Sequence, residues 1–255
     1  MCVLAVAAER KLTAEEVRNC FAANGDGAGV AWSRNGKNHF RKGFMDLGSF
    51  LAFYEQLEVL PHIVHFRVAT SGGVRRELTH PFIVSLASPL VLEWSGEEPL
   101  LAHNGVVADW QNTFLNFVPE IIRELRRRKQ GRALPPGPWS DTRAAAVMVA
   151  LAGDAVLPLL GGKWALLDSG KVQLYGDFVQ ERGVYFSNMT YKYGSRRSAS
   201  FFSPSLLAGS DKWSDLFDEE GDAYDAGTDG PDPVAPAQED SRKHRWMPRR
   251  NPRVD

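Results

Sequence analysis

Short apolar runs typical of β-strands are grouped along this chain, with helical stretches between the groups. The order is strand, helix, strands, helix, strands, helices, strands. A doubly wound parallel sheet alternates strands and helices more strictly, whereas two antiparallel sheets flanked by helices accommodate this order. We therefore predict an α+β fold built on antiparallel sheets.

Local signals set several boundaries of these elements. Thr13 and Glu16 form the pattern of a capping box, and Cys20 falls on the apolar face of the helix that follows, so Cys20 is predicted to be a core residue. Asn35-Gly36 predicts a hairpin turn. Pro119 predicts a break, or the first turn of a second helix, within the helical stretch 109–129. The other predicted helices are 47–57 and 140–152, and the strands are 3–8, 29–32, the segment around Phe40, 63–69, 91–94, 100–102, 164–167, 172–175 and 183–187.

Composition places the chain among ordinary globular proteins. Of 255 residues, 44% are hydrophobic and 24% are charged, and the net charge is −1, which favours neither a nucleic-acid partner nor a membrane partner. The basic stretch 123–129 is interpreted as a solvated helix end rather than a nucleic-acid contact. Two cysteines without metal-binding spacing indicate a reducing cytoplasm and no disulfide framework. No apolar run approaches the ~20 residues that span a bilayer.

The predicted globular part covers residues 2–210. Residues 218–240 are acidic and poor in large apolar side chains, and residues 242–253 are strongly basic. Such a segment buries too little apolar surface to offset its ordering entropy. We therefore predict a disordered tail over 211–255.

Cys2 follows the first methionine directly. If Met1 is removed, one residue carries both a thiol and a free α-amine, whose unperturbed pKa of about 8 suits a general base. Position alone also permits a simpler interpretation, in which Cys2 is a small residue at the start of a strand. Other segments of the sequence are needed to distinguish a catalytic Cys2 from a structural one.

Three further segments carry polar groups in an apolar context. Arg67 lies within a predicted strand, and a half-buried guanidinium needs an anionic partner such as a carboxylate. Asn104-Gly105 ends another strand, where an amide and a backbone N–H can form an oxyanion hole. Asp141 opens a helix. Each also has a simpler interpretation: a surface ion pair, a hairpin turn and a helix N-cap, respectively.

Together these groups describe one reaction. A thiol nucleophile, an amine base, an oxyanion hole, a cation and an anion suit the side-chain amide of a free amino acid. The cation would hold the α-carboxylate of that amino acid, and the anion would hold its α-ammonium group.

The chain resembles the class II glutamine amidotransferases, which have an N-terminal cysteine and belong to the N-terminal-nucleophile hydrolases. The similarity spans roughly residues 2–190, and seven motifs occur in the family order. They are Met1-Cys2, Asn24-x-Asp26-Gly27-x-Gly29-Val30-Ala31, His65-x-Arg67-x-Ala69-Thr70-x-Gly72, Thr79-His80-Pro81-Phe82, His103-Asn104-Gly105, Ser140-Asp141-Thr142 and Gly183-Val184-Tyr185-Phe186-Ser187-Asn188.

The resemblance implies a four-layer αββα sandwich and a glutaminase reaction. Cys2 would attack the glutamine amide, with Asn104 and Gly105 stabilising the oxyanion. A γ-glutamyl thioester would form and then be hydrolysed. Arg67 and Asp141 would hold the substrate head group. Thr70 would line the substrate pocket. The resemblance implies no cofactor and no metal.

The three motif histidines are expected to have structural roles, with His80 ordering its loop and His65 and His103 donating or accepting hydrogen bonds. Val68, Ser71 and Arg143 depart from the family pattern, which usually has an acidic residue at the last of these positions.

Only the charged tail follows the catalytic domain, so the expected partner is a separate synthase or ligase that accepts the ammonia. Two alternatives remain: a hydrolase of another γ-glutamyl amide without ammonia transfer, and an inactive binding scaffold.

Overall fold

The computed structural model describes residues 1–69 and 73–193 of the chain. Thr70 and the tail over 211–255 therefore lie outside the described residues, and the predictions made for them stay predictions.

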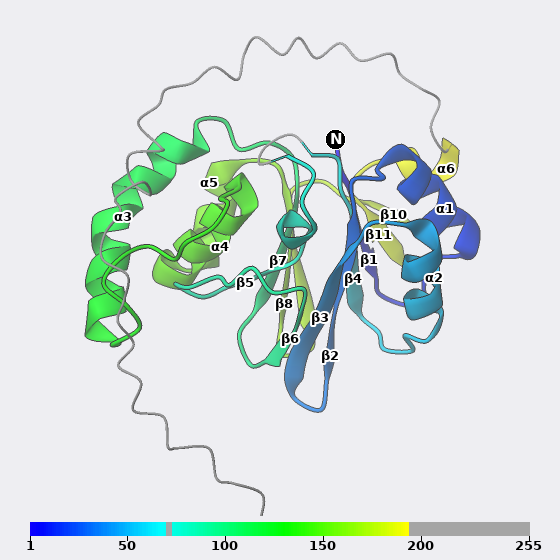
Figure 1. The fold of residues 1–255 in the computed structure, drawn as a ribbon. Helices are drawn as coiled ribbons and strands as arrows, with labels where there is room; N and C mark the ends of the chain where they lie inside the picture. Colours follow the sequence, from blue (N-terminus) through cyan, green and yellow to red (C-terminus); the bar gives the residue numbers. More distant parts are fainter. Residues whose placement is uncertain (70–72, 194–255) are drawn as a thin grey trace, which may run out of the picture. The chain divides into compact units, whose positions relative to one another are not determined.

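Two antiparallel sheets form the centre of the fold (Figure 1). The first has seven strands in the order β10-β11-β1-β4-β2-β3-β6, and the second has four in the order β5-β7-β8-β9. The strands of the first sheet are β1 (Val3–Ala7), β2 (Ala28–Arg34), β3 (Lys37–Phe44), β4 (His62–Phe66), β6 (Glu93–Gly96), β10 (Val179–Glu181) and β11 (Val184–Phe186). Those of the second are β5 (Phe82–Ile83), β7 (Leu100–Asn104), β8 (Lys163–Asp168) and β9 (Lys171–Tyr175).

Helices cover the outer faces of both sheets, as Figure 1 shows. The seven-stranded sheet carries α1 (Ala14–Ala23), α2 (Leu47–Glu55) and α6 (Thr190–Tyr193). On the other side, α4 (Asp141–Ala152) contacts β5 and β7, α3 (Trp110–Arg127) packs on α4, and α5 (Leu157–Leu160) follows it. Short 3₁₀ turns occupy Arg76–Leu78 and Asp154–Val156. The predicted α+β, four-layer αββα class is confirmed.

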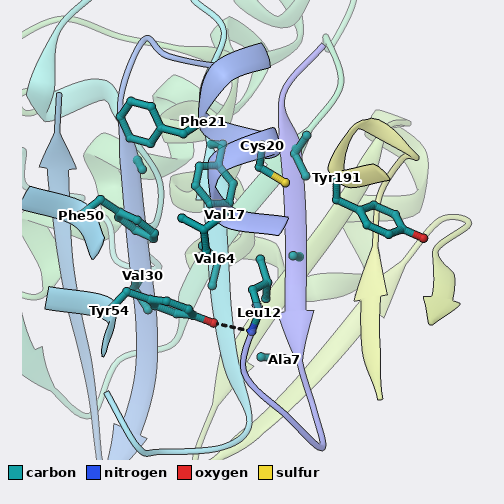
Figure 2. Close-up of a cluster of buried hydrophobic side chains, with 14 of the residues drawn as sticks. Ala7, Leu12, Val17, Cys20, Phe21, Val30, Phe50, Tyr54, Val64 and Tyr191 are labelled. Carbon is teal, nitrogen blue, oxygen red and sulfur yellow. Dashed lines mark hydrogen bonds between the residues drawn. The ribbon is translucent and has the colours of Figure 1, made fainter. Parts of the chain in front are cut away.

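The alternation of β1 explains how the two buried layers form. Val3 and Ala5 face α1 and α2, and the resulting layer, which includes Phe50, is drawn in Figure 2. Leu4 and Val6 face the four-stranded sheet and pack in the intersheet layer. All five residues of β1 are buried because both of its faces are covered. The same alternation directs Cys2 toward the second sheet.

Several local predictions are confirmed. Thr13 and Glu16 make a reciprocal capping box at the start of α1, and Cys20 is fully buried. Asn35 and Gly36 join β2 to β3 as a hairpin, with positive φ at both residues.

The prediction of a break at Pro119 is wrong, because α3 runs through it without interruption. Pro119 lies on the exposed face of the helix, where the carbonyl it leaves without a donor can be hydrated. The opposite face is buried along the whole helix, at Trp110, Phe114, Val118, Ile121 and Leu125, and this packing offsets the lost hydrogen bond. None of the helices in the described part of the chain is both long and apolar enough to cross a membrane.

Candidate active site

A small pocket lies where the N-terminal end of β1, the end of β7 and the start of α4 meet. Its cavity volume is about 20 Å³, which is room for roughly one water molecule. It is lined by Cys2, Arg67, Val68, Leu78, His80, His103, Gly105, Ser140, Asp141 and Thr142. Residues from three of the segments that sequence analysis singled out therefore meet Cys2 in one place.

The Cys2 thiol is held by the backbone of Val68. It accepts a hydrogen bond from the Val68 N–H at 3.3 Å, and it donates to the Val68 carbonyl at 3.5 Å. The Cys2 carbonyl accepts from Asn188 Nδ2 at 2.7 Å, which ties the residue to the segment after β11. Burial raises the pKa of the Cys2 thiol, so the neutral thiol predominates near pH 7. A nucleophilic role therefore requires a base.

Arg67 follows the end of β4 and is only 5% exposed. Its backbone N–H donates to the Gly27 carbonyl at 2.8 Å, and its Nη1 donates to the Gly73 carbonyl at 2.8 Å. Burial lowers the pKa of its guanidinium, which stays charged near pH 7. The surface ion pair considered as an alternative is contradicted by this burial. The cation instead borders the pocket.

Asp141 is the first residue of α4, and Ser140 is the N-cap, with its side chain accepting from the Arg143 N–H at 3.2 Å. The alternative interpretation of Asp141 as the N-cap is therefore wrong. Its carboxylate accepts from the Val107 N–H at 3.2 Å and from the Thr142 N–H at 2.8 Å. These bonds fix a carboxylate at the pocket wall.

Asn104 ends β7, and the chain then leads to α3 rather than into a paired strand, so the hairpin alternative is also wrong. Gly105 lines the pocket with a φ of +156°, and a Cβ there would lie 2.7 Å from His103 Nε2. Only glycine fits this close approach. The Asn104 side chain is buried and donates through Nδ2 to Ser187 Oγ at 2.8 Å.

Three buried histidines surround this end of the intersheet layer. The His65 and His80 rings lie 3.9 Å apart, and the His103 ring stacks on Trp164 at 3.8 Å. Burial lowers the pKa of His65 to about 3 and of His103 to about 4, and it lowers the pKa of His80 well below its usual value. All three are neutral near pH 7, so Arg67 supplies the positive charge among the described residues that line the pocket.

Two buried cations near the pocket have structural contacts that the sequence did not reveal. Lys42 in β3 donates through Nζ to the Pro81 carbonyl at 3.0 Å, next to His80, and burial lowers its pKa to about 7. Arg143 is 1% exposed and donates to the carbonyls of Ser88, Pro136 and Pro138. Arg143 therefore ties the segment of Pro136 and Pro138, which leads into Asp141, to the loop that contains Ser88.

The sequence signals for these contacts were weak or absent. Ser187 and Asn188 belong to the last of the seven motifs, but the resemblance implied no role for either residue. Lys42 gave no signal, because a lysine within a strand is usually exposed. Within the described residues no cluster of histidine, cysteine and acidic side chains is arranged to hold a metal ion.

No family model and no curated protein matches the sequence. Among solved structures, the chain is similar to a glutamine phosphoribosylpyrophosphate amidotransferase of B. subtilis in complex with ADP and GMP, with 15% identity and a TM-score of 0.42. A second similar structure is that of the allosteric regulatory enzyme of purine biosynthesis, with 15% identity and a TM-score of 0.38. Each match covers 73% of this chain and 41% of the other, so the chain spans about two fifths of the length of these proteins.

Proposed function

We propose that residues 2–210 form a glutaminase of the glutamine amidotransferase type, which acts in the cytoplasm and supplies ammonia to a separate acceptor enzyme. The observation that carries the proposal is the meeting of a thiol, a guanidinium, a carboxylate and a glycine backbone at one pocket, contributed by Cys2, Arg67, Asp141 and Gly105. These are the groups that a free amino acid with a side-chain amide requires.

In this proposal the head group of glutamine is held at both charges. The Arg67 fork binds the α-carboxylate, and the Asp141 carboxylate binds the α-ammonium group. Thr70 would add a contact to the substrate.

The reaction begins when the α-amine of Cys2 takes the thiol proton and the sulfur attacks the amide carbon. The carbonyl electrons move to oxygen, where the Asn104 amide and the Gly105 N–H stabilise the charge. Collapse of this intermediate breaks the C–N bond, and the nitrogen leaves as ammonia with the proton from the amine. Water then cleaves the thioester, which releases glutamate and restores the thiol. The amine is free only if Cys2 is the first residue of the active chain.

The test is an assay of glutamate and ammonia release from glutamine, using protein whose N-terminal residue has been identified by mass spectrometry. Cys2→Ala and Cys2→Ser should abolish release, because a hydroxyl is a far weaker nucleophile. Cys20→Ala is the matched control. Cys20 is buried in the layer beneath α1, and burial raises the pKa of its thiol, so this variant should keep its activity.

Three results would count against the proposal. An active Cys2→Ala variant would favour a scaffold or another site. Full activity with an uncleaved N-terminal extension would exclude the amine base. A preference for γ-glutamyl peptides over glutamine would favour the hydrolase without ammonia transfer.

The acceptor is sought by isolating complexes through the native chain. Glutaminase activity is then compared with and without the protein recovered, and an unchanged rate would argue against ammonia transfer to it.

A further inference from the structure

Ser187 joins β1, which begins directly after Cys2, to β7, which ends in Asn104. It follows β11 and is 1% exposed. Its backbone N–H donates to the Leu4 carbonyl at 2.8 Å, and its Oγ accepts from the Leu4 N–H at 2.9 Å. The same Oγ accepts from Asn104 Nδ2 at 2.8 Å. One hydroxyl therefore bridges the two sheets beside the pocket.

The polar atoms of Asn104 are unequally satisfied in this arrangement. Nδ2 donates to Ser187, whereas Oδ1 is buried and has no hydrogen-bond partner among the described residues. Ser187 Oγ accepts two N–H groups, which uses both of its lone pairs. A buried carbonyl without a partner is uncommon in a folded protein and calls for a specific reason.

A half-turn of the Asn104 amide satisfies the same atoms in a different way. Oδ1 then faces Ser187 and accepts its O–H, while Ser187 Oγ still accepts from the Leu4 N–H. Nδ2 turns to the position of the unpartnered oxygen and presents two donor hydrogens there. An anionic oxygen is the acceptor that suits such a group.

Asn104 is not itself among the residues that line the pocket, but two features bring it near the proposed chemistry. Leu4 faces the second sheet, and Cys2 lies two residues before it, so the alternation of an extended chain directs both side chains to the same side. Gly105 comes directly after Asn104 and lines the pocket together with Cys2. The two strand ends thus converge on one place.

We propose that Ser187 is a positioning residue, whose hydroxyl binds the Asn104 side-chain carbonyl. This leaves the Asn104 amide nitrogen to stabilise the oxyanion formed at Cys2. The inference rests on the proposed function. Ser187 does not touch the substrate and acts only through Asn104.

The matched pair Ser187→Thr and Ser187→Val tests this role, because the two side chains have nearly the same shape and differ in the hydroxyl. Ser187→Thr should keep kcat for glutamine within about 3-fold. Ser187→Val should lower kcat about 100-fold, at the lower end of the loss caused by removing one oxyanion-hole donor, and leave KM within about 3-fold. If Ser187→Val does not fold, Ser187→Ala is compared with Ser187→Thr in its place.

Two further measurements separate positioning from general damage. The double variant Asn104→Ala with Ser187→Val should be no slower than Asn104→Ala alone, since both remove the same interaction. Alkylation of Cys2 by iodoacetamide forms no oxyanion, so its rate should be unchanged in every Ser187 variant.

Each alternative has a distinct outcome. Full activity of the folded valine or alanine variant, or an additive loss in the double variant, overturns the role of Ser187 and leaves the proposed function standing. Slower alkylation in parallel with slower turnover shows that Ser187 only supports the fold. A wild-type chain without glutaminase activity overturns both proposals.

Discussion

Replacing Tyr54 with phenylalanine should destabilise this protein by about 3 kcal/mol, although it removes a single oxygen atom. Tyr54 lies in the layer beneath α2, where its hydroxyl accepts from the Leu12 N–H at 2.9 Å (Figure 2). The same hydroxyl lies 2.8 Å from His62 Nε2, and His62 Nδ1 lies 2.7 Å from the Val59 carbonyl.

The partners determine the direction of every bond in this chain. The Val59 carbonyl can only accept, so His62 carries its proton on Nδ1 and presents a lone pair at Nε2. The Tyr54 O–H therefore donates to Nε2, and its oxygen accepts from Leu12. The donors and acceptors of this hydrogen-bond series are therefore all paired, and the Tyr54 hydroxyl takes part in two of the bonds.

The predicted loss of stability comes from the two buried polar groups that lose their partner. Tyr54→Phe leaves the Leu12 N–H as a buried donor and His62 Nε2 as a buried acceptor, and the two residues are 5% and 0% exposed. Each unsatisfied group costs about 1–3 kcal/mol, and a partial offset comes from the more apolar ring. The aromatic contact with Phe50, 5.4 Å between ring centroids, is retained.

Urea unfolding at pH 7.5, followed by far-UV circular dichroism, measures the change. Tyr175→Phe is the control, because Tyr175 donates to Asp154 at 2.6 Å and both residues are partly exposed. Water can replace that hydroxyl, so this variant should lose less than about 1 kcal/mol. Equal losses in the free energy of unfolding of the two variants would refute the assigned bond directions and the predicted cost of the two unsatisfied groups.

Two further predictions concern the pocket and acid stability. Gly162→Ala should lower glutaminase kcat, because the added Cβ would overlap His103 at the pocket wall. Gly161→Ala is the control: it carries the same strain of a positive φ, but its Cβ meets nothing within 4 Å, so this variant should stay active. Equal activities of the two variants would exclude an effect of the overlap. Burial lowers the pKa of His62 from 6.5 to about 4, so the folded state binds fewer protons than the unfolded state in this window and loses stability as pH falls through it. Between pH 7 and pH 4, the free energy of unfolding measured in urea should fall by about 3 kcal/mol less in His62→Gln than in the wild type. Parallel plots of the free energy of unfolding against pH for the two proteins would contradict this.

Local signals were sufficient for the fold class and for most elements. The capping box at Thr13 and the turn at Asn35-Gly36 depend on residues within four positions of each other, so their meaning does not change with the rest of the chain. The order of strands and helices then favoured two antiparallel sheets. Pro119 failed as a signal because its effect depends on which face of α3 is buried, and packing on α4 sets that face.

The residue types of the candidate site were also readable in advance. Cys2, Arg67, Gly105 and Asp141 drew attention because their chemistry did not suit an apolar context, and all four border one pocket. What each does beyond that was open in the sequence. The pair Asn104-Gly105 fits a hairpin turn and the end of β7 equally well when only the sequence is known. In the same way, the sequence does not distinguish an Asp141 that caps a helix from an Asp141 whose carboxylate borders a pocket.

Only the tertiary structure decided which atoms are partners. Ser187 meets Leu4 across more than 180 residues of chain, and the Cys2 carbonyl meets Asn188 from a similar distance. Burial of Lys42 likewise depends on segments remote in the sequence. The sequence determines which groups a residue can offer. Whether a donor finds an acceptor, and whether a charge leaves water, depends on surfaces that exist only after both sheets have packed.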